Sequence, residues 1–236
     1  MFCVVTGFSP GFGMATAADT LGSQAYGRDS KSPLVGIVLQ QSVLILMLLA
    51  VPVGIVWWFA EPIFLLMRQD PEVAALGGLY CRVLILGLPA IYIFEALKKY
   101  TQVQGTASAC RGRATSGEPS SHTDCFTHEN GLGRGAGLTH VAMLALAVGA
   151  AVLALGSYLF IYAFGFGFVG APIALVVCYW SLVAFTLAYI KLRGLHRNTW
   201  YGWSRAALHG WGIYLRLGLP GMLMLMYVAM EEARTG

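Results

Sequence analysis

The sequence has few charged residues, and its cysteines follow no pattern. Only 11% of the 236 residues are Asp, Glu, Lys or Arg, whereas 57% are hydrophobic; a soluble domain usually carries about 25% charged residues. A chain of this composition cannot cover a soluble fold with polar surface. The five cysteines form no C-x-x-C pair and no dense framework, which excludes the disulfide-rich secreted class. The lipid bilayer is therefore the expected solvent.

Signatures of cofactor and metal chemistry are also scarce. No H-E-x-x-H motif occurs, and an enzyme is the least favoured class. Gly165, Gly167 and Gly170 satisfy G-x-G-x-x-G, but they stand between two apolar stretches and follow no strand, so they predict a tight extracellular turn. Four residues with zinc-binding side chains match no standard ligand spacing, and no metal site is expected from them: Cys110, His122, Cys125 and His128.

Long apolar stretches dominate the chain. A membrane-spanning helix needs about 20 mostly apolar residues, and six stretches approach or reach that length: 1–22, 34–60, 73–97, 140–163, 169–190 and 212–230. Trp57 and Trp58 stand near one end, where aromatic rings favour the headgroup level. We predict an all-α, polytopic transmembrane helical bundle of about five to six spans. Because the basic residues lie between the apolar blocks and form no stripe, a nucleic-acid partner is not expected.

The distribution of basic residues predicts the orientation in the membrane. Lys and Arg concentrate in the first, third and fifth connections between spans, whereas the second has mixed charges and the fourth has none. Short cytoplasmic loops retain an excess of basic residues. The odd-numbered connections are therefore expected in the cytoplasm, and the first helix is expected to run from outside to inside.

The chain divides into three parts by composition. Residues 1–104 and 140–236 carry the apolar stretches, whereas residues 105–139 are small, polar and without periodicity. Such a segment is too poor in large apolar side chains to order itself. We expect a polar, low-complexity cytoplasmic loop or an insertion there.

Two carboxylates fall inside the predicted spans, where a charge at mid-bilayer costs roughly 2.5–3.5 kcal/mol. Asp19 follows a stretch interrupted by Gly and Pro, and broken helices in transporters often line a substrate cavity. A pairing of Asp19 with Arg28 or Lys31 near the cytoplasmic end is the structural alternative. Glu95 stands three and four residues before Lys98 and Lys99, the helical spacing of an ion pair.

Glutamines are the other polar groups in or near the spans. Gln24, Gln40, Gln41 and Gln102 could form hydrogen bonds across helices or line a pore. Each of these side chains is weak evidence when taken alone.

Several strings resemble the multidrug and toxic compound extrusion family, and within it the animal branch. The stretch VTGFSPGFGMATAADTLGSQAYG, which ends with Asp19, Gln24 and Tyr26 in place, is similar to the family pattern A-x-[DE]-T-L-x-x-Q-x-Y-G. Further similar strings follow along most of the chain: GIVLQQSVLILMLL, RQDPEVA, LPAIYIFEALKKYTQVQG, ALGSYLFIYAFGFGFVGAPIA and TWYGWSRAALHGWGIYLRLGLPGMLML. The resemblance places residues 1–104 at the family's second to fourth helices, and 140–236 at the fifth, sixth and start of the seventh.

The resemblance implies a fold of two six-helix bundles, of which this chain carries most of one. It implies an antiporter that exports organic cations and xenobiotics by alternating access, with protons or sodium as the coupling ion and no cofactor. The animal branch uses protons and works largely at the plasma membrane. From the intramembrane polar groups and the resemblance together, the candidate transport or cavity residues are Asp19, Gln24, Tyr26, Gln41 and Glu95.

One part of the family pattern is missing. The animal branch is expected to place two functional glutamates after GMLML, and this chain has Val228 and Ala233 in those positions. Glu231 and Glu232 are close but out of register. A non-transporting membrane subunit or dominant-negative isoform, which forms a homo-oligomer or associates with a full-length transporter, is therefore a second hypothesis. A lipid-linked sugar flippase, whose cavity should be richer in basic residues, is a third.

Overall fold

The computed structural model describes residues 2–28, 34–114, 136–165, 167–192, 202, 205–208 and 210–235. Every regular element in these residues is helical. Five helices of this part are long and apolar enough to cross a membrane: Leu34–Trp58, Pro71–Gln104, Met143–Ala163, Gly167–Leu192 and Trp211–Glu232. They coincide with five of the six apolar stretches, so the predicted all-α transmembrane fold class is confirmed.

The first helix consists of a π-helical turn, η1 (Val4–Phe8), that continues into α1 (Ser9–Arg28). It corresponds to the first predicted stretch, residues 1–22, but it is less apolar than the five spans. Its position explains this composition. α1 packs against α2, α5 and α9, and small residues such as Ala15 and Ala17 are fully buried along it. A helix surrounded by other helices needs close backbone approach more than a lipid-facing apolar surface.

The second apolar stretch forms α2 (Leu34–Trp58), which is followed at once by the short α3 (Ala60–Leu66). Trp57 and Trp58 differ sharply in environment. Trp58 is 59% exposed, whereas Trp57 is fully buried and its indole N–H donates to Thr6 Oγ1 at 2.9 Å. Only Trp58 therefore fits the interfacial role predicted for both. Gly7 leaves room for the Trp57 ring, because a Cβ there would collide with it.

The third stretch forms α4 (Pro71–Leu84), a 3-10 turn η2 (Ile85–Gly87) and α5 (Leu88–Ala114). Asp70 caps α4 by accepting a hydrogen bond from Glu72 N at 3.2 Å, and Pro71 occupies the first helical position, where its missing N–H costs nothing. α5 extends well into the segment 105–139 that was expected to be a loop. The backbone is helical as far as Ala114 and again from Ala136; residues 115–135 lie outside the described part.

The last three apolar stretches form α7 (Ala136–Tyr158) with the π-turn η3 (Leu159–Ala163), α8 (Gly170–Leu192) preceded by η4 (Gly167–Val169), and α9 (Trp211–Thr235). The glycine motif between α7 and α8 is a turn, as predicted. Gly165 and Gly167 have φ values of 67° and 55°, which favour glycine. A Cβ on Gly170 would lie 3.0 Å from the backbone of Phe160. The motif therefore serves chain reversal.

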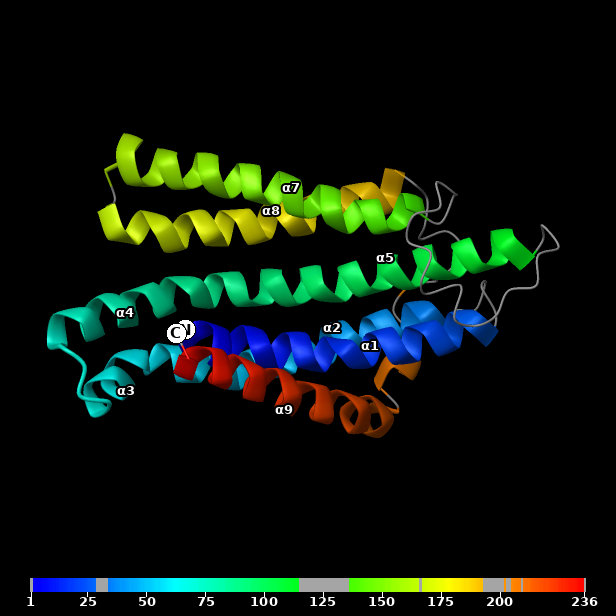
Figure 1. Cartoon of the computed structure of the whole chain (residues 1–236), viewed down its shortest axis with the longest axis horizontal. Helices are drawn as coiled ribbons and strands as arrows, with labels where there is room; N and C mark the ends of the chain where they lie inside the picture. The colour runs from blue at the N-terminus through cyan, green and yellow to red at the C-terminus, as the bar shows by residue number, and fades with distance from the viewer. Residues whose placement is uncertain are drawn as a thin grey trace.

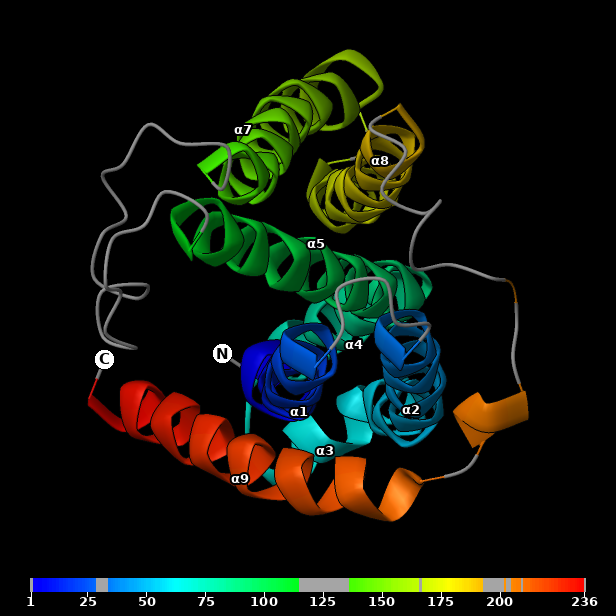
Figure 2. The same ribbon diagram turned by 90° about the vertical axis from the view of Figure 1, so that its right-hand side faces the viewer.

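The helices form layers around α5 and α1 (Figures 1 and 2). α5 lies between the α7–α8 pair and the α1–α2 pair, and α9 covers the opposite side of α1. The outer helices present large apolar side chains to the surroundings; Leu155 on α7 and Met224 on α9 are 71% and 68% exposed. This exposed apolar surface suits contact with lipid chains.

The helix ends agree with the alternation of charge along the chain. The C-terminal ends of α1, α5 and α8 and the N-terminal end of α7 lie at one end of the bundle, and the α3–α4 and α7–α8 turns lie at the other (Figure 1). The three connections that are rich in Lys and Arg therefore all begin at the same end of the bundle. Because short cytoplasmic loops carry an excess of Lys and Arg, this end of the bundle is expected to face the cytoplasm.

Candidate functional site

A partly exposed ion pair joins α1 and α5. Lys99 Nζ on α5 donates to Asp19 Oδ2 on α1 at 2.5 Å. The Lys99 side chain is 20% exposed and that of Asp19 is 42% exposed. A pairing of Asp19 with Arg28 or Lys31 was the structural alternative, and those two side chains lie outside the described part of the structure; the partner that the structure shows is Lys99, 80 residues further along the chain. The pair therefore fixes the register of α1 against α5.

A second ion pair lies on α5 itself. Lys98 Nζ donates to Glu95 Oε1 at 2.6 Å with the predicted helical spacing, and the Glu95 side chain is only 6% exposed. The same ammonium lies over two aromatic rings, 5.9 Å from the centroid of Phe12 on α1 and 5.8 Å from that of Phe94 on α5. Distances within about 6 Å are those of cation–π attraction. We call Phe12, Phe94, Glu95 and Lys98 the cation cage.

The chemistry of this arrangement follows from its charges. Two carboxylates, Asp19 and Glu95, face two ammonium groups, Lys99 and Lys98, so the formal charges of the four residues cancel. A buried carboxylate with two aromatic faces attracts a cation in a low-dielectric environment. In this structure the chain's own Lys98 fills that place. Another cation can enter only if Lys98 moves away, and a proton on either carboxylate weakens the hold on its lysine.

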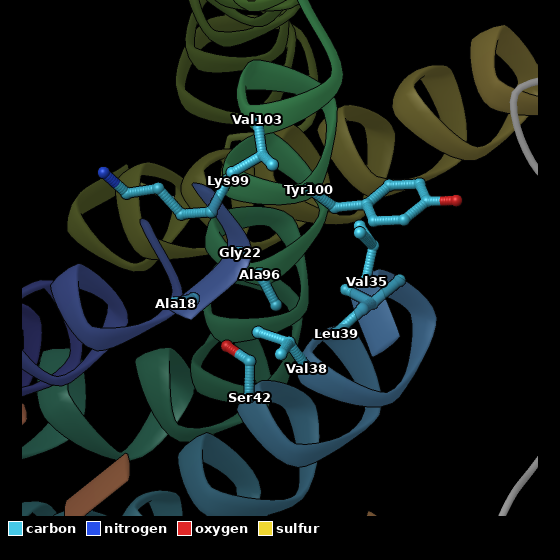
Figure 3. A pocket seen from close by; sticks show the side chains of 10 residues that line it. All are labelled: Ala18, Gly22, Val35, Val38, Leu39, Ser42, Ala96, Lys99, Tyr100 and Val103. Atoms are coloured by element: carbon cyan, nitrogen blue, oxygen red, sulfur yellow. The ribbon is translucent and has the colours of Figure 1, made fainter. Parts of the chain in front are cut away.

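A small pocket lies beside the Asp19–Lys99 pair, between α1, α2 and α5 (Figure 3). Its volume of about 10 Å³ has room for roughly one water molecule. The wall is mostly aliphatic, and the Lys99 amino group points away from it (Figure 3). The lining residues are Ala18, Gly22, Val35, Val38, Leu39, Ser42, Ala96, Lys99, Tyr100 and Val103. A pocket of this volume is too small for an organic cation.

The polar side chains of α2 serve a different contact. Gln40 Nε2 donates to the carbonyl of Gly202 at 2.7 Å, and Tyr214 Oη lies 3.0 Å from Ser42 Oγ. The predicted cavity residue Gln41 is nearly buried, and its amide nitrogen lies near Gly210, where a Cβ would be 3.7 Å away. The contacts of Gln40, Gln41 and Ser42 hold α2 against the segment before α9 and against α9 itself. Gln41 therefore contacts this junction between α2 and the segment before α9.

Gln24 and Tyr26 are the two predicted residues that remain. Gln24 is exposed on α1, one turn beyond Asp19. Tyr26 lies within α1, and its side chain is outside the described part of the structure. Of the residues with zinc-binding side chains, His122, Cys125 and His128 are likewise outside it. Among the residues that the structure does describe, no three His, Cys, Asp or Glu side chains group as metal ligands.

Sequence reasoning also overlooked one motif near the start of the chain and found no nucleophile motif there. Residues 7–11 spell G-x-S-x-G, the nucleophile motif of many hydrolases, which requires a sharp strand-to-helix turn. Here the chain is helical throughout these residues, and Ser9 is 7% exposed. No strand precedes the serine, so the motif carries no exposed nucleophile.

Sequence reasoning missed the residues that complete the cage. Phe12 stands seven residues before Asp19, which places both on one face of α1, opposite the two lysines. The spacing of Phe12 and Asp19 could have been noticed in the sequence, but an aromatic residue in an apolar helix is common. No local sequence pattern indicated which helix would pack against this face. Lys98 and Lys99 were named only as partners of Glu95, although each reaches toward α1.

The acidic residues at the end of α9 stand apart from this site. Glu231 and Glu232 are exposed in the last turns of α9, and Val228, which takes the place of an expected glutamate, is 41% exposed. α9 contributes no carboxylate to the recorded contacts of Asp19 or Glu95.

Comparisons of the sequence agree on one family. Residues 1–110 match the MatE family. An uncharacterized transporter of Schizosaccharomyces pombe is 34% identical over 228 residues, and multidrug and toxin extrusion protein 1 of Danio rerio is 34% identical over 221 residues. The alignments cover 95% and 94% of this chain but only 36% and 32% of the two relatives. The chain thus spans about a third of the length of these curated relatives.

Solved structures show the same relation in three dimensions. The eukaryotic MATE transporter AtDTX14 superposes with a TM-score of 0.74 at 24% identity, over 96% of this chain and 43% of that one. The inward-facing conformation of a multidrug resistance MATE transporter gives a TM-score of 0.66 at 21% identity, over 95% of this chain and 44% of that one. At these identities the likeness shows the fold, and the fold corresponds to somewhat less than half of each transporter.

Proposed function

This chain belongs to the MATE family of multidrug and toxin extrusion transporters, which are integral, multi-pass membrane proteins and not enzymes, and from that premise we propose that it exports organic cations in exchange for protons by alternating access. Organic cations are the proposed substrates, and the proton is the proposed coupling ion. The cation cage of Phe12, Phe94, Glu95 and Lys98 is the proposed place of exchange.

The observation that carries this proposal is the position of Lys98. Its ammonium lies 2.6 Å from a nearly buried carboxylate and about 6 Å from two ring centroids. This is the chemistry that recognises an organic cation: a negative charge for attraction and aromatic faces for a delocalised or alkylated positive group. We infer that an incoming cation displaces Lys98 from Glu95 and takes over these contacts.

Proton coupling follows from competition for the same carboxylates. A protonated Glu95 or Asp19 has no negative charge to offer, so proton binding and cation binding oppose each other. The Asp19–Lys99 pair ties α1 to α5, and loss of that pair on protonation would free the two helices to shift. Proton entry from one side can then accompany cation release to that side.

The test compares cation transport by variants of these carboxylates. We expect Asp19→Asn and Glu95→Gln to reduce proton-gradient-dependent flux of a fluorescent organic cation in vesicles at least tenfold. Glu72→Gln, which changes an exposed carboxylate at the start of α4, is the matched control and should keep normal flux. Unchanged flux in both carboxylate variants, with normal amounts of inserted protein, would remove the cage and the ion pair from the mechanism.

The two other functions make different demands. A non-transporting subunit requires that the chain co-purify with a full-length transporter and reduce the flux of that partner. A lipid-linked sugar flippase should offer free basic groups to anionic headgroups, whereas Lys98 and Lys99 are both neutralised by carboxylates. The paired lysines favour the cation exporter over the flippase.

The plasma membrane is the proposed location. Separation of cells into plasma-membrane and internal-membrane fractions, each identified by its own marker protein, tests this proposal. Recovery of the chain only in internal membranes would contradict it.

A further inference from the structure

Two cysteines from distant parts of the chain meet at one end of the bundle. Cys3 Sγ, at the start of the first helix, lies 3.4 Å from Cys81 Sγ on α4, and 78 residues separate them. Cys81 is 2% exposed, whereas Cys3 is partly exposed. Both are free thiols in this structure. The scattered cysteines of the sequence predicted no disulfide framework, and this single contact requires none.

The contact is held in place from both sides. On one side of Cys3, the ring of Phe2 packs edge-on against Phe64 of α3, with 4.9 Å between centroids. On the other side, Thr6 Oγ1 accepts the hydrogen bond from the Trp57 indole of α2. The first turns of the helix are therefore fixed against α2 and α3, and the two sulfurs meet through packing that does not depend on them.

The separation is short enough for bond formation. A disulfide needs about 2.05 Å between the sulfurs, so a side-chain adjustment of little more than 1 Å brings the thiols to bonding distance. Cys3 directly precedes η1 and Cys81 lies in α4, and α4 and the start of the first helix lie away from the end where the connections rich in Lys and Arg begin (Figure 1). Because that basic end is expected in the cytoplasm, Cys3 and Cys81 are expected in the outer half of the bundle, toward the compartment where disulfides persist.

We propose that Cys3 and Cys81 form a site of oxidative modification, in which the two thiols become an interhelical disulfide. Hydrogen peroxide is the oxidant. The more exposed Cys3 attacks one peroxide oxygen as the O–O bond breaks; one water leaves, and Cys3 becomes a sulfenic acid. The Cys81 sulfur then attacks the Cys3 sulfur and forms the S–S bond, and the hydroxyl group leaves with the Cys81 proton as a second water. Two thiols and one peroxide give one disulfide and two waters.

The consequence is a covalent link between the first helix and α4. The first helix carries Phe12 and Asp19, so the link fixes the helix that forms half of the cation cage. A disulfide of this kind is reversible by added dithiol, through exchange with an attacking thiolate. The modification depends only on the meeting of the two thiols and stands whether or not the chain exports cations.

The test counts reactive thiols on the full chain in membranes. In a background with Cys110, Cys125 and Cys178 changed to Ser, the chain is exposed to hydrogen peroxide, quenched, denatured in detergent and treated with a polyethylene-glycol maleimide. We expect two additions before oxidation, none after it, and two again after dithiothreitol. Two additions after oxidation, or a covalent dimer in place of the internal link, would overturn the proposal.

A matched pair of cysteines provides the control. Cys178 is also buried, but it lies on α8, where its thiol donates to the carbonyl of Gly149. A chain that keeps only Cys3 and Cys178 has no second thiol beside Cys3, so after the same treatment Cys178 should still react with the maleimide and no linked Cys3–Cys178 peptide should form. Loss of both reactive thiols, or a Cys3–Cys178 link, would show that the oxidation does not report proximity and would count against the proposal. Mass spectrometry of the oxidised wild-type chain should give a linked Cys3–Cys81 peptide, and a link of Cys3 to any other cysteine would contradict it.

Discussion

Replacement of Lys98 by Met tests the ion pair of the cation cage through stability. The substitution leaves the Glu95 carboxylate, whose side chain is 6% exposed, without its ammonium partner. Removal of one partner from a buried pair costs about 3–5 kcal/mol, and because Lys98 is 22% exposed we expect the lower end, about 3 kcal/mol. For a chain of this size each kcal/mol shifts the Tm by roughly 2–4 °C, so the Tm should fall by about 6–12 °C.

The reciprocal change has a smaller expected effect. Glu95→Gln leaves Lys98 with its aromatic neighbours and partial access to solvent, so the loss should be about 1 kcal/mol, the worth of one hydrogen bond. In the double variant the unpaired carboxylate is gone. Its loss of stability should therefore be clearly less than the sum of the two single losses, which is the signature of direct coupling.

The assay is thermal unfolding in detergent, followed by tryptophan fluorescence. Lys191→Met changes an exposed lysine near the end of α8 and is the control, with an expected change within about 0.5 kcal/mol. A Tm for Lys98→Met within 2 °C of wild type, or a double variant whose loss equals the sum of the single losses, would refute the pairing.

Three further predictions concern the packing around the site, each read by the Tm of the variant in detergent. Gly13→Val should destabilise the chain by about 1–3 kcal/mol, because a Cβ at Gly13 would lie 2.6 Å from a backbone oxygen of α9. Gly212→Ala is the control and should have a small effect, because a Cβ at Gly212 meets nothing within 4 Å. Equal losses of stability in the two variants would contradict the close approach of α1 and α9. Tyr92→Phe removes a buried 2.8 Å hydrogen bond to the carbonyl of Gly7 and should cost about 1–3 kcal/mol; no loss would show that the bond is not made. Gly167→Ala should cost about 1–2 kcal/mol because φ is 55° there, and a neutral result would mean that the turn has another conformation.

The fold was largely readable from the sequence because membrane spans are specified locally. Length and hydropathy of single segments suffice to place helices, and five of the predicted stretches became spans. The errors fell where burial by neighbouring helices decides the outcome. The first helix contains Gly, Thr and Asp19 and is less apolar than the spans, yet it packs in the centre of the bundle. Trp57 is a core residue for the same reason, because Gly7 of another helix makes room for it.

The candidate site was predictable only in part, and the limit is also physical. The Glu95–Lys98 pair could be predicted from helical spacing alone. The Asp19–Lys99 pair and the contact of Lys98 with Phe12 join residues of different helices, and no local pattern encodes which helices become neighbours. Gln41 shows the same limit, since the sequence left open whether this side chain forms a contact across helices or lines a pore, and only the structure places it near Gly210, before α9.

Simultaneous recording of cation and proton movement tests the central claim most directly. Vesicles that carry this chain would be loaded with a fluorescent pH indicator, and an inward gradient of an organic cation would be imposed at equal starting pH, beside vesicles without the protein. We predict that cation entry drives protons out, so that the vesicle interior becomes alkaline, and that Glu95→Gln abolishes this change. Cation entry without any change of internal pH, or no cation entry through well-inserted protein, would contradict the proposed exchange.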